Sequence, residues 1–506
     1  MKPNHAETNE LLKKLGKSAS WWRRFFESND AEDIHQIISG LSPLDLASLD
    51  QRTRGYSAYS YYNQNNWQKL RPSDVRRLAQ SKFETSLVGL ASFHFSGYVR
   101  QAAVAELASQ RTGKELPFLL IRLNDWVSQV REAAAKEVRA RIEPDYAVHL
   151  LANISLVLRL RHCGRVEKKF VDDICVLLKR AECRDVLQVG TKSKDKTVRR
   201  ISFRLAAEAE PSSRTAIIRA VMTDPDAVAR SWAVRHFLPD VSPDELPGVL
   251  EPMFKDCFMP VRRDALWFAA TKRPDIAKQP LRDALLDNHI SMRETARQFL
   301  GMAEVKSARD FYAHTIEHGK EQQRFAAICG LGETGKAIDL PVVAPFQNSP
   351  LTKIRRAAAY AIGRLDLEGQ LPKLVSALSD SKPSVSREAL KALQTKARYI
   401  SLAELENLFA GGADFHLRRN VLTLILHTDK WKKIPTLLKA SADKDARIAE
   451  QAAKALRAWS TNYNGSFAEP NREDVQRISV ALNQFEPYLP HGFALELRAC
   501  LKIYFK

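Results

Sequence analysis

The sequence of 506 residues lacks several features that would each place it in a particular class of protein. No apolar run approaches the roughly 18–20 residues that a membrane-spanning helix needs. The N-terminal residues are polar and lack the apolar stretch of a secretory signal. The six cysteines form no Cys-x-x-Cys pair of the kind found in metal or redox sites. We therefore expect a cytoplasmic protein with reduced thiols and without a membrane span.

Negative charge is scarce relative to positive charge. The chain has 78 Lys and Arg against 59 Asp and Glu, a formal net charge of +19. Residues 155–204 alone hold 14 basic and 6 acidic residues. Such an excess attracts polyanions, which include nucleic acids, acidic proteins and anionic lipid surfaces. The same excess also fits an ordinary solvated face of a basic protein, so charge alone does not identify a partner.

What the sequence does have is a repeat. An arginine in equivalent context returns along most of the chain, and from Arg199 onward the steps are 31 or 32 residues. A further step of 32 reaches Glu450, and the gap of 68 before Arg199 has room for one degenerate copy. The arginines are Arg100, Arg131, Arg199, Arg230, Arg262, Arg293, Arg324, Arg355, Arg387 and Arg418. A period of this length indicates stacked supersecondary units rather than one globular core.

Each unit has the pattern of two antiparallel helices with a short turn between them. In residues 371–393, two segments with helical apolar spacing flank the turn-forming residues 379–384. Counting from the arginine, position −1 is usually apolar and position +3 is usually alanine. Residues four positions apart lie on the same face of a helix, so we expect both to face into the stack. Position −6 is often aspartate, where we expect the N-cap of the second helix. These aspartates are Asp125, Asp224, Asp256 and Asp287.

The Asp…Val-Arg…Ala-Ala unit resembles HEAT repeats, in particular the short bacterial type named after phycobilin lyases. The resemblance covers about residues 90 to 460 and implies an all-α fold, an α-solenoid of about eleven helical hairpins. It also implies that the recurring arginines and turn aspartates form a structural ladder between successive repeats. We expect an N-terminal capping region over 1–85, the repeat solenoid over 86–460 and a C-terminal helical cap over 461–506.

The N-terminal region is rich in aromatic residues. Residues 21–26 read Trp-Trp-Arg-Arg-Phe-Phe, and a Gly/Ser/Asn-rich stretch holds Tyr56, Tyr59, Tyr61, Tyr62 and Trp67. These rings suit the covering of the open end of a stack, which is the interpretation that we favour. Exposed aromatic rings also suit gripping a partner or stacking on bases.

Motifs for chemistry are weak. Residues 330–337 nearly match a phosphate-binding loop, but Ala337 replaces the metal-binding Ser or Thr, and the glycines follow an alanine-rich helix, where a helix C-cap explains them. His162, Cys163, Cys175 and Cys183 have no zinc-site spacing. HEAT-like iron hydroxylases use His-Glu pairs, and this chain has no His-Glu dipeptide. Sharing a type of repeat with phycobilin lyases does not imply that this chain has their activity. We expect no enzyme activity, metal or cofactor.

The better candidate is a surface. Positions +1 and +5 lie roughly opposite the packed face of the second helix and, in HEAT arrays, would line the concave side. Basic groups with interleaved aromatics suit anionic partners. Position +1 also carries Glu132, Glu294 and Glu388, as an ordinary solvated face would. The candidate binding residues are Arg200, Arg204, Arg235, Arg263, Trp267, Arg356, Tyr360 and Arg419, with Lys192, Lys194 and Lys196.

These features favour a non-enzymatic scaffold that binds an acidic protein partner through a basic concave surface. The alternative is a nucleic-acid-binding protein, since some alkylpurine DNA glycosylases are similar in being HEAT-like, basic and lined with aromatics. Those enzymes need an acidic residue beside cradle aromatics, and Asp264 near Trp267 is the one arrangement of that kind here.

Overall fold

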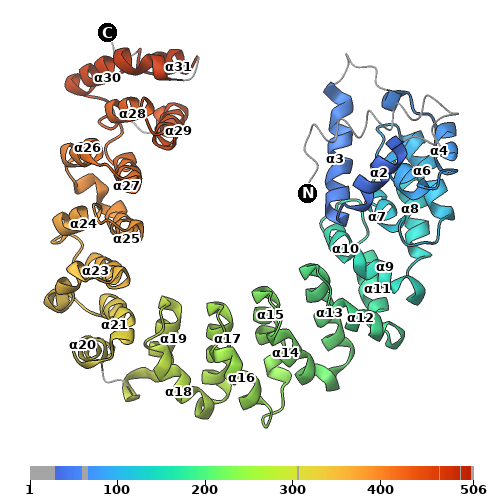
Figure 1. The fold of residues 1–506 in the computed structure, drawn as a ribbon, viewed down its shortest axis with the longest axis horizontal. Coiled ribbons are helices and arrows are strands. Elements are labelled where there is room, and N and C mark those ends of the chain that lie inside the picture. The colour runs from blue at the N-terminus through green and yellow to red at the C-terminus, as the bar shows by residue number, and fades with distance from the viewer. Residues whose placement is uncertain (1–28, 60–65, 305–306, 466–467, 490–491, 503–506) are drawn as a thin grey trace. The chain divides into compact units, whose positions relative to one another are not determined.

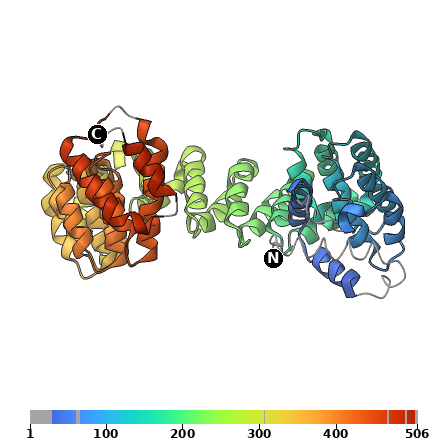
Figure 2. The same cartoon turned by 90° about the horizontal axis from the view of Figure 1, so that it is seen from above.

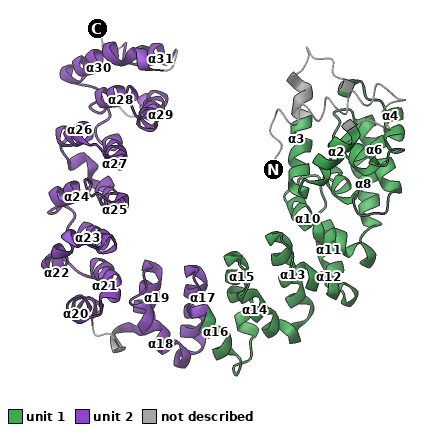
Figure 3. Cartoon of the chain, viewed as in Figure 1, with its two compact units in different colours: residues 1–252 green, residues 253–506 purple. Residues whose placement is uncertain are grey.

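A computed structural model describes residues 29–59, 66–304, 307–465, 468–489 and 492–502. Within these ranges every regular element is a helix and none is a strand (Figures 1 and 2). The helices divide between two compact units, residues 1–252 and 253–506 (Figure 3). Successive helices pair as hairpins that stack on one another, so the predicted all-α solenoid is confirmed. No helix of the described residues is long and apolar enough to cross a membrane.

The first unit begins with helices that lie outside the 31-residue repeat. Helix α2 packs on α5, α3 on α7 and α10, and α4 on α5 and α6, so these three helices cover the first hairpins of the stack. The helices of this unit are α2 (Asn29–Ser39), α3 (Pro43–Tyr59), α4 (Pro72–Leu78), α5 (Glu84–Ala91), α6 (Gly97–Ser109), α7 (Leu116–Arg122), α8 (Ser128–Arg139), α9 (Ala147–Ala152), α10 (Ile154–Leu160), α11 (Lys169–Leu178), α12 (Arg184–Gly190), α13 (Lys196–Ala209), α14 (Arg214–Met222) and α15 (Ala227–Phe237), with α16 (Leu246–Phe254) at its end.

The degenerate copy between Arg131 and Arg199 is irregular. Its first helix is broken at Asn153 into α9 and α10, and its second helix is α11. Arg139 near the end of α8 donates to Glu167 at 3.0 Å and lies over the Phe170 ring, so the start of α11 meets the end of α8. In a regular stack the starts of successive second helices would meet. The loss of the sequence pattern therefore coincides with a shift in the stacking.

The second unit is more regular. Its second helices α21, α23, α25, α27 and α29 pack on one another in order, and first helices such as α20, α24 and α26 form the other row (Figure 1). Its helices are α17 (Met259–Lys272), α18 (Pro274–Ala284), α19 (Ile290–Glu304), α20 (Ala308–His318), α21 (Glu321–Thr334), α22 (Leu340–Val343), α23 (Thr352–Leu365), α24 (Leu371–Ala377), α25 (Pro383–Leu393), α26 (Leu402–Gly411), α27 (Phe415–Leu426), α28 (Ile434–Ser441), α29 (Ala446–Asn462), α30 (Arg472–Phe485) and α31 (Phe493–Leu501).

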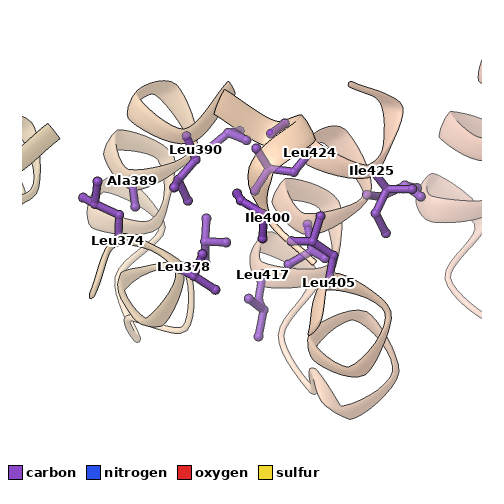
Figure 4. Packing of buried hydrophobic residues seen from close by; sticks show 14 of the residues in the cluster. Leu374, Leu378, Ala389, Leu390, Ile400, Leu405, Leu417, Leu424 and Ile425 are labelled. Carbon is purple, nitrogen blue, oxygen red and sulfur yellow. The ribbon is translucent and has the colours of Figure 1, made fainter. Parts of the chain in front are cut away.

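The core of the second unit follows the repeat. Figure 4 shows Leu374 and Leu378 of one hairpin facing Ala389 and Leu390, with Leu405 and Leu417 of the next hairpin beyond them. Positions −1 and +3 of the repeat are buried as predicted, for example Val261 and Ala265, which are both fully buried. Alanine at +3 leaves room for close approach of neighbouring helices. Helices α30 and α31 continue the pattern, because α30 packs on α28 and α31 on α29.

Two details of the sequence prediction are wrong. The N-caps of the second helices lie at position −4, as with Asp195, Asp226 and Asp445, and not at −6. The last repeat is aligned one residue too late at Glu450, because Ile448 and Ala452 are its fully buried pair.

Candidate interaction surface

The recurring arginines tie neighbouring repeats together. Arg355 donates to both carboxylate oxygens of Asp380, at 2.7 and 3.0 Å, and to the carbonyl oxygen of Ser349 at 2.9 Å. It thereby links the turn before its own helix to the turn of the following repeat, with the planar two-point geometry that makes arginine–carboxylate pairs strong. The same arginine–aspartate spacing of 25 residues recurs in Arg100–Asp125, Arg199–Asp224, Arg262–Asp287 and Arg418–Asp443.

The aspartate of each rung has a second role. Asp380 Oδ1 accepts from the backbone amide of Lys382 at 2.8 Å, and Asp224 Oδ1 accepts from that of Asp226 at 2.7 Å. These bonds stabilise the turn two residues before the N-cap. Asp224, at position −6 before Arg230, is therefore explained by the turn and by Arg199 of the preceding repeat, and Asp380 has the same role seven residues before Arg387.

The most buried rung is Arg100–Asp125. Both side chains are fully buried, with Arg100 Nε and Nη2 donating to Asp125 at 2.9 and 2.7 Å. Arg122 donates to the same carboxylate at 3.2 Å and also pairs with Asp50. Burial alone would raise the pKa of Asp125, but the hydrogen bond from Arg100 and the charge of Arg122 hold it below its ordinary value.

The ladder does not extend to all ten arginines. Arg387 is exposed, and 25 residues later the chain has Gly412, which offers no carboxylate. Arg324 is half-buried, and its Nε lacks a hydrogen-bond partner among the described residues. The contact with the preceding turn is more widespread than the ion pair, since Arg131 and Arg230 donate to the carbonyl oxygens of Asp125 and Asp224, six residues before each. Asp256 likewise accepts through its carbonyl oxygen from Arg262.

Arg293 joins a different cluster. It donates to Glu333 on α21, with Nε 3.2 Å from Oε2, and Arg297 donates to the same carboxylate at 2.8 Å. Tyr360 completes the set by donating to Glu333 Oε1 at 3.2 Å. Burial and the charge of Glu333 raise the pKa of the Tyr360 hydroxyl. Sequence reasoning missed this cluster, because Glu333 lies 40 residues from Arg293 and outside the repeat pattern.

At least three of the six arginines of the predicted basic surface are paired with carboxylates of the protein. Arg200 Nη2 donates to Asp226 Oδ1 at 2.9 Å, and Arg204 Nε donates to Glu208 at 2.8 Å. Arg263 donates to its neighbour Asp264 at 2.9 Å. Such pairs cancel much of the positive potential that positions +1 and +5 were expected to provide. Asp264 is held by Arg263, which does not favour a role as a catalytic base.

The expected orientation of +1 and +5 also varies between repeats. On α21 these positions are Phe325 and Cys329, and both are buried rather than facing solvent. Burial raises the pKa of the Cys329 thiol to about 12. Tyr360 is half-buried and engaged with Glu333, and Arg356 lies over the Phe325 ring at 5.3 Å. The prediction that +1 and +5 lie roughly opposite the packed face is therefore wrong at α21.

The remaining predicted residues are accessible. Trp267 is 45% exposed and meets Phe299 edge-on, with 4.8 Å between ring centroids. Arg235 and Arg419 are exposed, each on its own second helix. Lys192 and Lys194 are exposed in the turn between α12 and α13, and Lys196 is exposed at the first residue of α13. These three exposed lysines, called the lysine turn below, lie within five residues of one another at the start of α13.

The glycine-rich near match of residues 330–337 is a packing feature. Helix α21 runs through Gly330 and Gly332 and is C-capped by Gly335. A Cβ on Gly330 would lie 2.4 Å from the Tyr312 ring, and one on Gly332 would lie 2.6 Å from Ala361 Cα. Glycine is therefore required here by the close approach of neighbouring helices, in addition to the expected C-cap.

Two further sequence features fall elsewhere. Trp67 is buried, and its carbonyl oxygen lies 2.9 Å from His94 Nε2, whereas Tyr61, Tyr62 and residues 21–26 lie outside the described residues. Cys163 and Cys175 are half-buried and Cys183 is buried. Over the part of the chain that the structure describes, no group of three or more His, Cys, Asp or Glu side chains is placed to hold a metal ion.

Comparisons with known proteins find only weak structural similarity. No family model matches the sequence, and no curated protein matches it. A structure of the karyopherin Kap121p bound to the extreme C-terminus of the phosphatase Cdc14p aligns with 99% of this chain and 65% of its own, at 10% identity and a TM-score of 0.37. Yeast importin-beta (Kap95p) aligns with 95% of this chain and 65% of its own, at 12% identity and a TM-score of 0.30. The chain thus spans less than two thirds of these two proteins, and similarity this weak supports no functional conclusion.

Proposed function

We propose that this chain is a non-enzymatic scaffold of HEAT-like hairpins that binds an acidic segment of a protein partner at the lysine turn, residues 191–196. The observation behind the proposal is the group of three exposed cations, Lys192, Lys194 and Lys196, for which no ion pair with a described residue exists. The single carboxylate of the turn, Asp195, is engaged as the N-cap of α13, where it accepts from the amide of Thr197 at 2.6 Å.

Folding stability does not account for these lysines. Lys194 and Lys196 flank the N-terminus of α13, where the helix dipole disfavours positive charge. Each cation at such a position costs about 0.3–1 kcal/mol when solvent-exposed. An acidic segment laid across the turn would meet both the lysines and the positive end of the helix. The positive charges at this helix N-terminus are therefore better explained by the binding of an anion than by the stability of the unbound protein.

A protein partner is favoured over nucleic acid by the pairing of the other cations. A nucleic-acid track needs many phosphate contacts in a row. Arg200 and Arg204, which were expected to continue the track along α13, are held by Asp226 and Glu208. What remains is a short basic patch, which suits a short acidic stretch.

The test compares two triple variants with equal change in net charge. K192E/K194E/K196E reverses the lysine turn, and K373E/K382E/K444E reverses three exposed lysines scattered over the second unit. Binding of a fluorescein-labelled peptide rich in Asp and Glu is followed by anisotropy at low salt. Loss of three exposed charge pairs should cost about 2 kcal/mol, a roughly thirtyfold rise in Kd.

The matched variant should change Kd by less than about threefold, the part attributable to net charge alone. Equal weakening by both variants would mean that the protein attracts acidic peptides without a defined site. Binding of single- or double-stranded DNA tighter than that of the peptide, and lost in the first variant, would favour the nucleic-acid alternative instead.

A further inference from the structure

A cavity of about 490 Å³ lies where the N-terminal helices meet the first hairpins of the stack. Its walls come from α2, α3, α5, α7 and the break between α9 and α10. The floor is apolar, with Ile38, Leu46 and Phe118 buried and Phe83 half-buried. The volume falls within the roughly 300–1,000 Å³ of small-molecule sites. The site depends on non-repeat helices, so no sequence period pointed to it.

The cavity has positive charge and no negative charge. Lys82 and Lys114 line it, and its lining contains no Asp or Glu. Each of the other three cavities described has at least one carboxylate in its wall, such as Glu406, Glu132 or Asp380. Both lysines are exposed, and neither has an ion pair with a described residue. Lys82 lies over the Phe83 ring, 4.8 Å from its centroid.

The other polar groups of the lining are occupied within the protein. Thr85 donates its hydroxyl to Gln110 at 2.7 Å, and the Asn153 amide donates to the carbonyl oxygen of His149 at 2.9 Å. His35 Nδ1 lies 2.8 Å from Ser86 Oγ, so one ring nitrogen of His35 and the Ser86 hydroxyl are engaged with each other. The two ammonium groups are the charged donors that the lining offers to a ligand.

We propose that this cavity binds a small amphipathic organic anion, with its apolar body on the floor formed by Ile38, Leu46 and Phe118 and its carboxylate head between Lys82 and Lys114. The apolar floor supplies the affinity, and the lysines select for the charged head. An uncharged ligand of the same shape loses the charge-assisted contacts, and a bare anion loses the burial of its chain.

The probe is decanoate, titrated calorimetrically into the full chain below its micelle concentration. We expect one saturable site. Each methylene removed from a chain that lies in the cavity should weaken binding about fourfold, so octanoate should bind roughly fifteenfold less tightly. The matched neutral probe 1-decanol should bind less tightly than decanoate, and acetate should show no saturable binding.

Variants separate the head site from the floor. K82M/K114M should weaken decanoate binding but leave 1-decanol unchanged, whereas the control K69M/K136M, which removes two exposed lysines outside the cavity, should alter neither. Ala152→Trp, at an exposed part of the lining, should abolish binding of both by filling the mouth. A melting temperature equal to that of the wild type would show that Ala152→Trp is folded. If this variant does not fold, K82M/K114M still tests whether the lysines bind the carboxylate.

Absence of saturable decanoate binding to the wild-type chain would overturn the proposal. So would equal affinity for decanoate and 1-decanol combined with no effect of K82M/K114M, because the lysines would then play no part in recognition. Unchanged decanoate binding in a folded Ala152→Trp variant would place the ligand outside this cavity.

Discussion

Replacing Asp125 by asparagine tests the arginine ladder at its most buried rung. The carboxylate is fully buried and accepts from Arg100 at 2.9 and 2.7 Å, from Arg122 at 3.2 Å and from the backbone amide of Val127 at 3.0 Å. The asparagine keeps the volume of the side chain but removes the charge. Arg100 is then left as a buried cation without its counter-ion, which costs about 3–5 kcal/mol.

Hydrogen exchange of the full chain, read by mass spectrometry, measures this loss locally. A loss of 3–5 kcal/mol corresponds to roughly a hundred- to several-thousandfold faster exchange in the most protected amides of α5 to α8. Helices α23 to α27 of the second unit should exchange as in the wild type. The matched variant Asp287→Asn removes the partner of Arg262 at a rung where both side chains are 17% exposed, so water replaces part of the lost interaction.

We therefore expect Asp287→Asn to cost clearly less than Asp125→Asn. The reasoning would be refuted if Asp125→Asn changed exchange in α5 to α8 by less than about tenfold, or if the two variants had equal effects. Either result would mean that burial of the pair does not set the energy of the rung.

Gly332→Ala should lower the melting temperature strongly, because the new Cβ would lie 2.6 Å from Ala361 Cα. In the control Gly411→Ala the new Cβ meets nothing within 4 Å, so this variant should be neutral or slightly stabilising. Thermal unfolding followed by circular dichroism compares the two variants. Glu333→Gln should cost about 3–5 kcal/mol, because two buried or half-buried arginines lose their shared carboxylate; urea unfolding that shows less than 1 kcal/mol would contradict this. The pKa of Asp125 is lowered in the folded chain, so the contribution of this carboxylate to folding stability is fully present above the ordinary pKa of 3.8 and is lost as the pH falls below it. Hydrogen exchange in α5 to α8 should therefore accelerate at such a pH. The acceleration should be smaller in Asp125→Asn, which has no carboxylate to protonate.

The period of the arginines was sufficient to predict the architecture. A residue that returns every 31 or 32 positions with an apolar neighbour at −1 and alanine at +3 needs the same environment each time, and stacked hairpins supply it. The buried pairs Val261–Ala265 and Val130–Ala134 show this environment directly. Local signals were less exact, since the turn aspartates mimic N-caps but accept from an amide two residues later.

The chemistry of the surface was harder to predict from the sequence. Whether Arg200 is available depends on Asp226, which lies 26 residues later in the chain but beside it in the stack. The cluster around Glu333 joins residues up to 40 positions apart without a periodic pattern. The cavity beside Phe118 exists because the non-repeat helices α2 and α3 pack on the first hairpins. Contacts of this kind depend on how whole helices pack together, and this packing cannot be predicted from any single segment of the sequence.

The measurement that tests the proposed function most directly is the position of a bound acidic peptide on the chain. A peptide rich in Asp and Glu that carries a photo-activated cross-linker is bound to the full chain, irradiated, and its attachment sites are mapped by mass spectrometry. We predict cross-links concentrated at the lysine turn, residues 191–196, and at the first turn of α13, with loss of this signal in K192E/K194E/K196E. Cross-links spread over both units, or gathered around Arg419 on α27 and unchanged in that variant, would contradict the proposal.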